Sequence, residues 1–221
     1  MKPKRTLVIG DVHGCIDELT ELLEKMGYQH PEDDLVFVGD LINKGPKSLE
    51  VLDFVQKHHA IVTMGNHELK FLRAMEQNLP SSPKLNELKV QMGANLPMWL
   101  NTLRNFPPFW ENEHCLVVHG GLVPGMDPKN TPLHMLATIR TWDGIGKDLQ
   151  NPNNPPWYDS FENTKVKVFG HWAARGLVDL PHALGLDTGC VYGRKLTGVI
   201  LPERTLYQVQ ARKQYCSFEE T

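Results

Sequence analysis

Five short stretches of the sequence place a side chain that can bind a metal beside a glycine. They contain Asp11 and His13 in GDVHG, Asp40 in GDLINKG, Asn66 and His67 in GNHE, His119 in HGG and His171 in GH. Carboxylate, imidazole and amide groups together suit borderline divalent ions such as Mn, Zn or Fe better than they suit thiophilic ions. One such stretch is commonly a structural turn, but five of them in one chain predict a metal site.

These side chains are too many for a single ion. Two ions about 3.5–4 Å apart, bridged by one carboxylate, would use the set, activate a water molecule and hold phosphate oxygens. The stretches therefore predict a hydrolase with two divalent ions. Mn is the preferred ion, and Zn, Fe, Co and Mg are the alternatives.

The elements that position these residues begin with short apolar runs. Residues 6–10 (TLVIG), 34–39 (DLVFVG) and 60–65 (AIVTMG) are rich in β-branched side chains and end in glycine, which is typical of buried strands. Between these runs, apolar residues recur at helical spacing in 15–28 and 48–58. The first part of the chain thus predicts a βαβαβ unit, and ligands of open α/β sheets bind at the carboxyl ends of such strands.

The second half of the chain contains further short runs divided by turn residues. CLVVHG and KVKVFG predict two more strands, while HALGLDTG, KLTGVIL and TLYQVQA predict a second, more antiparallel sheet. The expected fold class is α/β (α+β), in a single domain over residues 1–221, because this length suits one core. Residues 78–97 predict an insertion or lid, and residues 143–163 predict a long active-site loop.

Composition narrows the range of partners. The net charge of −3 gives no basic footprint for nucleic acid or an anionic membrane. The apolar run before Asp11 is too short for a signal peptide, and no run approaches the roughly 18 residues of a membrane span. The four cysteines form no C-x-x-C pair, which favours a reducing, cytoplasmic setting. We expect a phosphorylated small molecule or nucleotide as partner, and no membrane or extended nucleic-acid surface; the oligomeric state is left open.

The order GDVHG…GDLINKG…GNHE…HGGL…GH resembles the metallophosphoesterase superfamily and, within it, the phosphoprotein phosphatase family, over residues 10–193. The resemblance implies a calcineurin-like fold, with two mixed β-sheets in a sandwich flanked by helices and a dinuclear site at one edge. It implies one metal held by Asp11, His13 and Asp40, and a second held by Asp40, Asn66, His119 and His171. It also implies that His67 is a general acid, and we expect Glu68 to support it.

Two positions depart from the protein phosphatases of that family. Their GDYVDRG motif has Asp and Arg where this chain has Asn43 and Lys44. GDLINKGPKSLEVL is similar instead to ApaH-like phosphatases, and LDTGCVYGRKLTG resembles those and the symmetrical diadenosine tetraphosphatases. We expect Lys44 to neutralise a phosphate oxygen as a mobile point charge. Asn43 is expected to accept a hydrogen bond from His67 through its amide oxygen without adding charge.

Substrate recognition is expected from residues outside the metal motifs. Arg140 is the first candidate for a second phosphate clamp, and Arg175 is the next. Trp142, Trp157 and Tyr158 have two open interpretations: they stack on a nucleobase, or they fix the long loop to the core.

Three functions remain to be compared. The first is a phosphoanhydride hydrolase acting on dinucleoside polyphosphates such as diadenosine tetraphosphate, nucleotides, capped RNA or polyphosphate. The alternative is a serine/threonine or dual-specificity protein phosphatase acting on phosphomonoesters. A catalytically silent scaffold is a third, but the complete set of ligand-type residues argues against it.

Overall fold

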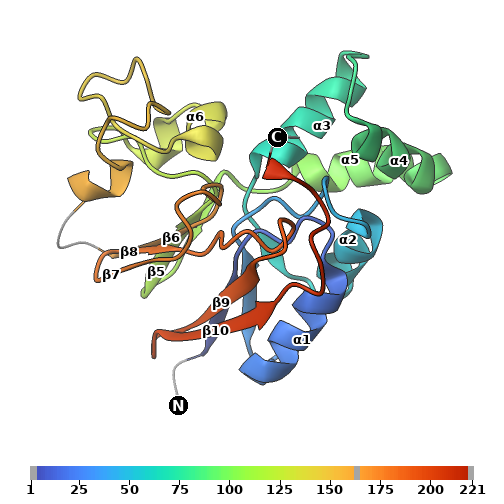
Figure 1. Cartoon of the computed structure of the whole chain (residues 1–221), viewed down its shortest axis with the longest axis horizontal. Coiled ribbons are helices and arrows are strands. Elements are labelled where there is room, and N and C mark those ends of the chain that lie inside the picture. Colours follow the sequence, from blue (N-terminus) through green and yellow to red (C-terminus); the bar gives the residue numbers. More distant parts are fainter. Residues whose placement is uncertain (1–3, 162–164, 219–221) are drawn as a thin grey trace.

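The computed structural model describes residues 4–161 and 165–218, and it contains two five-stranded sheets and six α-helices within those residues (Figure 1). The first sheet has the order β10-β9-β1-β2-β3, and the second has the order β4-β5-β6-β8-β7. Both sheets are mixed. The predicted fold class, an α/β sandwich of two mixed sheets flanked by helices, is confirmed.

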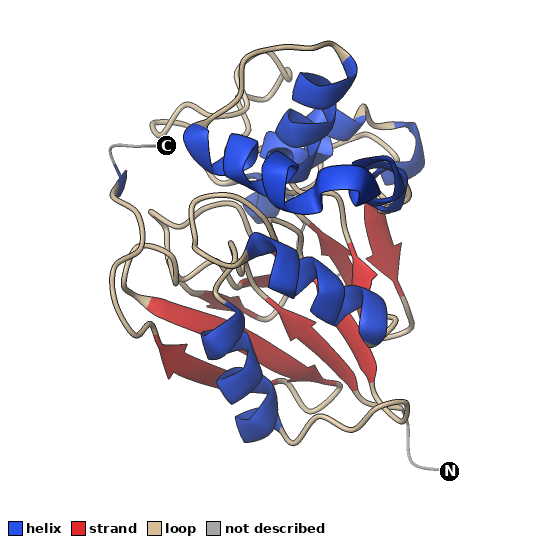
Figure 2. Cartoon of the chain, turned by 90° about the vertical axis from the view of Figure 1, so that its right-hand side faces the viewer, coloured by secondary structure: helices blue, strands red, loops and turns tan. Residues whose placement is uncertain are grey.

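The first sheet contains the predicted βαβαβ unit. Its strands β1 (Thr6–Ile9), β2 (Asp34–Phe37) and β3 (Ile61–Val62) are parallel, and helices α1 (Ile16–Met26) and α2 (Ser48–Lys57) connect them. Each helix buries the apolar stripe that its sequence predicts, including Leu19 and Leu22 in α1 and Leu52 in α2. The helices lie across one face of the sheet (Figure 2).

The last two strands extend the first sheet, which corrects the prediction that their sequences belong to the second. Strand β9 (Lys195–Leu201) is antiparallel to β1, and β10 (Thr205–Gln210) is antiparallel to β9. Residues 196–201 are all buried, because α1 covers one face of β9 and the second sheet covers the other. A run buried on both faces suits an interior strand.

The second sheet is built from the middle of the chain. It contains β4 (Phe109–Glu111), β5 (Cys115–Val118), β6 (Val166–Phe169), β7 (Val178–Leu180) and β8 (Ala183–Gly185). Two of its pairings are parallel and two are antiparallel, as in the first sheet, so the prediction of a more antiparallel second sheet is wrong.

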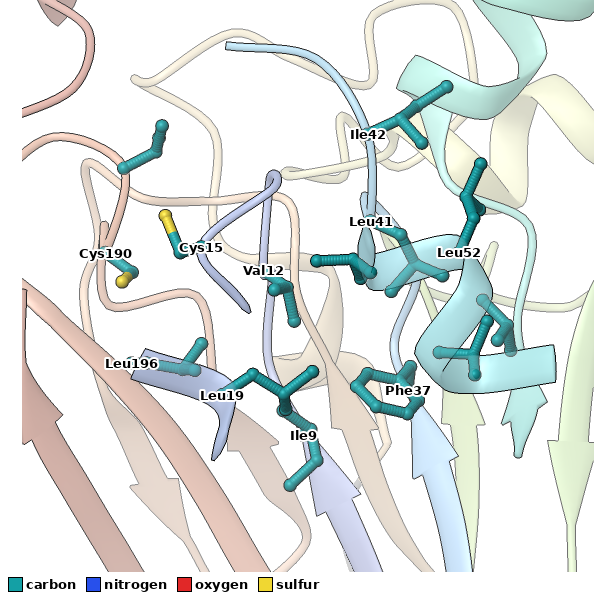
Figure 3. Close-up of a cluster of buried hydrophobic side chains, with 14 of the residues drawn as sticks. Ile9, Val12, Cys15, Leu19, Phe37, Leu41, Ile42, Leu52, Cys190 and Leu196 are labelled. Carbon is teal, nitrogen blue, oxygen red and sulfur yellow. The ribbon is translucent and has the colours of Figure 1, made fainter. Parts of the chain in front are cut away.

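Two apolar layers hold this arrangement together. Val8, Val36 and Val199 of the first sheet pack against Val117 and Leu184 of the second, which closes the sandwich. A second layer lies between the first sheet and its helices, where Ile9, Leu19, Phe37, Leu52 and Leu196 gather (Figure 3). The inner strands β9, β1 and β2 of the first sheet are thereby packed on both faces.

Three further helices follow β3 in the upper part of Figure 1. They are α3 (Asn66–Glu76), α4 (Pro83–Met92) and α5 (Leu96–Arg104), so the predicted insertion at 78–97 consists largely of α4 and its connections. Helix α4 contacts α2 and α5. Whether this segment closes as a lid stays a prediction. None of the helices in the described ranges is both long enough and apolar enough to cross a membrane.

The long loop at 143–163 follows α6 (Leu133–Thr138); its residues 162–163 lie outside the described part of the chain. Trp157 and Tyr158 are 0% and 1% exposed and pack against Phe169, with Trp142 on the same cluster. For Trp157 and Tyr158, the structure therefore supports the interpretation that they fix the loop to the core. The role of 143–163 as an active-site loop stays a prediction.

Candidate metal centre

All five predicted stretches meet where strands of the two sheets end. Asp11 and His13 follow β1, Asp40 follows β2, Asn66 and His67 begin α3 just after β3, His119 follows β5, and His171 follows β6. Contacts of their side chains, with one another or with a backbone N–H group, link every stretch to the others. We call Asp11, His13, Asp40, Asn66, His119 and His171 the metal centre.

Asp40 lies in the middle of this group. Its Oδ2 atom is 3.3 Å from His119 Nε2, 3.6 Å from His13 Nε2 and 3.9 Å from His67 Nε2. Two sets of ligand atoms that could each hold a metal ion share this carboxylate: one with His13 and His67, the other with His119 and His171. A side chain common to two sets is placed as a bridging ligand would be.

The second set includes an amide oxygen. Asn66 Oδ1 lies 2.9 Å from both His119 Nε2 and His171 Nδ1. The backbone N–H of His171 donates to the Asp11 carboxylate at 3.1 and 3.3 Å, which ties the β6 loop to the β1 loop. Asp11 is 4% exposed and His119 is 0% exposed, so these donors face one another away from bulk water.

The protonation pattern of these imidazoles fits metal ions. His119 Nδ1 lies 2.9 Å from the Val38 carbonyl oxygen, and His13 Nδ1 lies 2.9 Å from that of Ile42. A carbonyl only accepts, so each Nδ1 carries a proton, and each ring, when neutral, presents an Nε2 lone pair to Asp40. A lone pair that faces a carboxylate needs a cation between the two, either a metal ion or a proton on the ring. Divalent ions therefore suit this set.

The pKa values of these histidines also indicate that the buried carboxylates favour a positive charge nearby. Burial alone would lower the pKa of His119, but the carboxylates of Asp40 and Asp11 outweigh it and raise the pKa to about 9. Burial holds the pKa of His13 and that of His171 well below the usual value, which favours the neutral, ligand-competent form of both rings.

The backbone at the site is strained in the way that functional loops often are. Left-handed φ angles occur at His13 (44°), Asp40 (50°), Asn43 (73°), Lys44 (64°) and His171 (65°). Such a conformation costs a non-glycine residue about 1–3 kcal/mol and persists only when the surroundings enforce it. The enforced geometry aims these five side chains into one site.

Two glycines make room for the carboxylates. A Cβ atom at Gly65 would come within 2.3 Å of Asp40 Oδ1, and one at Gly170 would come within 2.0 Å of Asp11 Oδ1. Both contacts are far closer than real side chains allow. The glycine before each of these stretches is therefore required by the neighbouring ligand and not only by a turn.

Glu68 supports the loop that carries Asp40. It is fully buried and accepts hydrogen bonds from the backbone N–H groups of Asp40 (2.9 Å), Leu41 (2.9 Å) and Ile42 (3.2 Å). Burial and the Asp40 charge raise the pKa of Glu68 to about 7. Its hydrogen bonds are directed to this loop and not to His67, so Glu68 acts by holding Asp40 in place.

His67 is linked to Asn43 and, through it, to the segment before α4. Asn43 Nδ2 lies 2.8 Å from His67 Nδ1, and Ser82 Oγ donates to Asn43 Oδ1 at 3.2 Å. We expected the amide oxygen to face His67, but that oxygen is engaged by Ser82. His67 Nδ1 therefore accepts, and the neutral ring carries its proton on Nε2, the nitrogen nearest to Asp40. Burial lowers the pKa of His67 to about 4, and Lys44 adds to this while Asp40 opposes it.

A cavity of about 640 Å³ opens onto these residues. Asp40, Asn66, His67 and His171 line it, together with four basic side chains. We call these four the cationic rim: Lys44, Lys70, Lys84 and Arg140. Ser82 and Pro83, from the predicted insertion, also line the cavity. Among the described residues of the 143–163 loop, none lines it.

The two predicted arginine clamps have different positions. Arg140 is half-buried, lines the cavity and donates to the His171 carbonyl oxygen at 3.4 Å, while its Nε has no partner among the described residues. Arg175 is exposed, does not line the cavity, and lies over the ring of Trp172. The geometry favours Arg140 as a phosphate contact and gives no support to Arg175.

Sequence reasoning missed two residues at the site. Tyr192 accepts a 2.7 Å hydrogen bond from Lys44 Nζ. Asp187 is 7% exposed, and burial raises its pKa to about 6. Asp187 follows the glycine-ended strand β8, so the same strand-end pattern could have identified it. No local pattern singled out Tyr192.

Comparisons with known proteins agree with this geometry. The sequence profile of the calcineurin-like phosphoesterase family matches residues 4–205. The chain is 30% identical to a symmetrical bis(5'-nucleosyl)-tetraphosphatase of Aromatoleum aromaticum, over 95% of this chain and 98% of the relative. A relative with the same name from Coxiella burnetii is 31% identical, over 94% and 92% of the two chains.

Solved structures share the architecture. A crystal structure described as that of a candidate diadenosine tetraphosphatase superposes with a TM-score of 0.83 and 29% identity, over 95% of each chain. A protein serine/threonine phosphatase from Saccharomyces cerevisiae superposes with a TM-score of 0.71 and 19% identity, over 96% of this chain and 82% of the other. The second similarity concerns the fold alone.

Proposed function

The chain belongs to the calcineurin-like phosphoesterase family, and we propose that this metal-dependent hydrolase cleaves phosphoanhydride bonds in dinucleoside polyphosphates. Diadenosine tetraphosphate represents the class. Relatives that match the chain over nearly their whole length carry the name of that activity. Nucleotides, capped RNA ends and inorganic polyphosphate contain the same bond and are the nearest competing substrates.

The observation that carries the proposal is the cationic rim. Lys44, Lys70, Lys84 and Arg140 line one cavity beside the metal centre. A phosphomonoester presents a single dianion, whereas a polyphosphate chain presents several charges in a row, and a group of cations complements the longer anion. A serine/threonine protein phosphatase remains the alternative, because a metal centre of this kind also suits phosphomonoesters.

The metals belong to the same proposal. Asp11, His13 and Asp40 would hold one divalent ion, and Asp40, Asn66, His119 and His171 would hold the other. The mixed oxygen and nitrogen donors suit borderline divalent ions; we propose Mn, with Zn, Fe, Co and Mg as alternatives. Bound ions of this kind supply an activated water and polarise the phosphoryl oxygens.

The side chains around the metals have separate tasks. Lys44 and Arg140 neutralise phosphate oxygens, and Arg140, with its planar guanidinium, can also fix their orientation. An arriving phosphate anion raises the pKa of His67, because nearby negative charge favours the protonated ring. The imidazolium then donates its Nε2 proton to the departing phosphate oxygen and returns to the neutral form.

Asn43 and Ser82 orient the ring of His67. While the ring is neutral, the Asn43 amide donates to Nδ1 and leaves the single ring proton on Nε2, and Ser82 keeps the amide turned that way. The imidazolium needs an acceptor at Nδ1, and the Asn43 amide oxygen is the atom that could supply it. A phosphoanhydride leaving group is less basic than a serine alkoxide and makes smaller demands on the acid. An uncharged partner at residue 43 is therefore sufficient for this substrate class. We place the enzyme in the cytoplasm, where reducing conditions suit its four buried cysteines.

A substrate panel tests the proposal. We expect kcat/KM for diadenosine tetraphosphate with Mn to exceed that for a phosphoserine peptide by at least about tenfold, or roughly 1.4 kcal/mol of transition-state discrimination. ATP, capped RNA and inorganic polyphosphate complete the panel at matched concentrations. A preference for the phosphopeptide would establish the alternative, and inactivity on every substrate with each of Mn, Zn, Fe, Co and Mg would leave only the silent scaffold.

A further inference from the structure

A second, smaller cavity opens beside the metal centre, and we propose that it binds one nucleoside of the substrate. This side pocket has a volume of about 310 Å³ and lies between α3 and α6, which contact each other. Both helices lie above the sheets in Figure 1. The proposal rests on the proposed function for the identity of the substrate, but the pocket can be tested separately.

The side pocket adjoins the larger cavity. Asn66 and Lys70 line both. Asn66, at the first position of α3, belongs to the metal centre, and Lys70 lies one turn further along the helix. The side pocket thus begins beside the metal centre, and a phosphate chain that lies along α3 past Lys70 would lead from one cavity to the other.

One face of α3 forms a wall of the side pocket. Its members are Asn66, Leu69, Lys70, Arg73 and Ala74. Their spacing of three and four residues places them on a single side of the helix. This wall begins at a metal-centre residue and leads away from it.

The other walls come from two separate segments. Leu79 and Pro80 follow α3, and His134 and Thr138 lie one turn apart on α6. Arg140 of the cationic rim comes two residues after Thr138. Both α3 and the α6 segment thus connect the side pocket to the phosphate-binding side of the site.

The walls suit a nucleobase. Leu69, Ala74, Leu79 and Pro80 present apolar surface, and the His134 ring is a flat group beside them. Leu79 is 50% exposed, so a large apolar side chain stands in water at this place. Small-molecule sites are mostly apolar with a few polar groups that fix orientation, and a base offers two apolar faces to such walls.

The cations on α3 suit the phosphates that would link this nucleoside to the metals. Neither Lys70 nor Arg73 has a hydrogen bond or ion pair from its side chain within residues 4–161 and 165–218. Lys84 of the cationic rim, by contrast, pairs with Glu87 at 2.8 Å. Lys70, at the junction, is thus a cation available to an anionic ligand.

The volume of the side pocket indicates which part of a substrate it can hold. A cavity of 310 Å³ is at the lower end of ligand sites, which span about 300–1,000 Å³. It can hold one nucleoside but not both halves of a dinucleotide. Inorganic polyphosphate has no apolar part to fill it. The geometry therefore favours substrates that carry a nucleoside at one end of a phosphate chain.

The test replaces an apolar wall with charge and compares two substrates. Leu79→Asp is expected to lower the ratio of kcat/KM for diadenosine tetraphosphate to that for p-nitrophenyl phosphate by about tenfold, the lower range for lost apolar contacts. Val90→Asp is the matched control, because Val90 is 79% exposed on α4 and lines neither cavity. A ratio in Leu79→Asp within twofold of the parent would overturn the proposal.

A binding measurement separates the pocket from the activity. By calorimetry, Leu79→Asp should weaken binding of AMP relative to inorganic phosphate by about tenfold, whereas Val90→Asp should not. The parent enzyme could fail to cleave diadenosine tetraphosphate while Leu79→Asp still weakens AMP binding. In that case the side pocket is a nucleoside site, and the proposed function is wrong. If Leu79→Asp binds AMP as the parent does, the pocket assignment fails whatever the enzyme cleaves.

Discussion

Asp40 and Lys70 both face the cavity, yet they belong to two physically different regions. Asp40 is 2% exposed, has three histidine rings within 4 Å and is held through its backbone by Glu68. Lys70 is exposed, and its ammonium has no partner within the described ranges. One region is fixed before any ligand arrives, and the other keeps its charge free for the ligand.

This difference assigns the tasks of the enzyme. Metal chemistry requires ligand atoms held to within fractions of an ångström, and burial with backbone hydrogen bonds provides that precision. Recognition of a long, flexible polyphosphate tolerates movement, so mobile lysines on helices α3 and α4 are adequate. Substitutions in the metal centre should therefore remove activity, whereas substitutions on the cationic rim and side pocket should redirect it.

The largest effect is expected at the centre of the buried region. Asp40→Asn removes the negative charge shared by both sets of ligands, so metal content and turnover should fall together, with activity reduced by about 10³-fold or more, because the metals contribute several kcal/mol. Metal analysis and kcat measure the two losses. Asp53→Asn, at an exposed position on α2, is the control. An Asp40→Asn enzyme with two bound ions and near-normal turnover would contradict the shared-ligand assignment.

The next effect separates proton donation from metal binding. His67→Asn should keep both ions and slow turnover by about 10²–10⁴-fold, the usual contribution of general acid–base catalysis. The deficit should be smaller for p-nitrophenyl phosphate than for alkyl phosphates, because a good leaving group needs less protonation. If His67→Asn slowed turnover of both esters equally, His67 would not be the general acid.

A smaller effect is expected at Glu68, which does not belong to the metal centre but holds the loop of Asp40. Glu68→Gln places an amide where a carboxylate accepts three backbone N–H groups, so the Asp40 loop should loosen and metal affinity should fall by about 10–100-fold, as is usual for groups that orient ligands. Titration with Mn measures the change. Glu50→Gln, at an exposed position on α2, should bind Mn like the parent. If Glu68→Gln binds Mn with the affinity of the parent, the Asp40 loop keeps its conformation without the Glu68 carboxylate.

The smallest effect concerns substrate choice at the boundary of the two regions. In Asn43→Asp with Lys44→Arg, the carboxylate favours the protonated His67, and the guanidinium grips a monoester in bidentate fashion. The ratio of kcat/KM should shift toward a phosphopeptide and away from diadenosine tetraphosphate by about tenfold, or roughly 1.4 kcal/mol. A shift of less than twofold would show that residues 43 and 44 do not determine substrate preference, and Arg140 and the side pocket would then be the residues to test.

The metal centre could be expected from the sequence because its residues occupy strand ends. Asp11, Asp40 and Asn66 each follow a glycine at the end of an apolar run, and parallel strands bring such ends to one edge of a sheet. At this edge, the same strand ends that are visible in the sequence also bring the ligands together in the fold. Asp187 also lies just past a glycine-ended strand, β8, but Leu186 separates it from Gly185, so it does not follow the glycine directly as the other residues do.

Recognition residues could not be found in this way. Lys70, Leu79 and His134 form one site only because α3 and α6 pack together, and no local pattern records that contact. The orientation of the Asn43 amide likewise depends on Ser82, 39 residues away in the sequence. The placement of β9 beside β1 was missed for a related reason, since strand order depends on which faces become buried.

The measurement that tests the central claim most directly is product analysis of diadenosine tetraphosphate hydrolysis by the parent enzyme. With Mn present, we predict conversion to two molecules of ADP, complete loss of this reaction with a chelator, and its recovery when Mn is restored. Intact diadenosine tetraphosphate under conditions where the same enzyme and Mn release phosphate from a phosphopeptide would contradict the account.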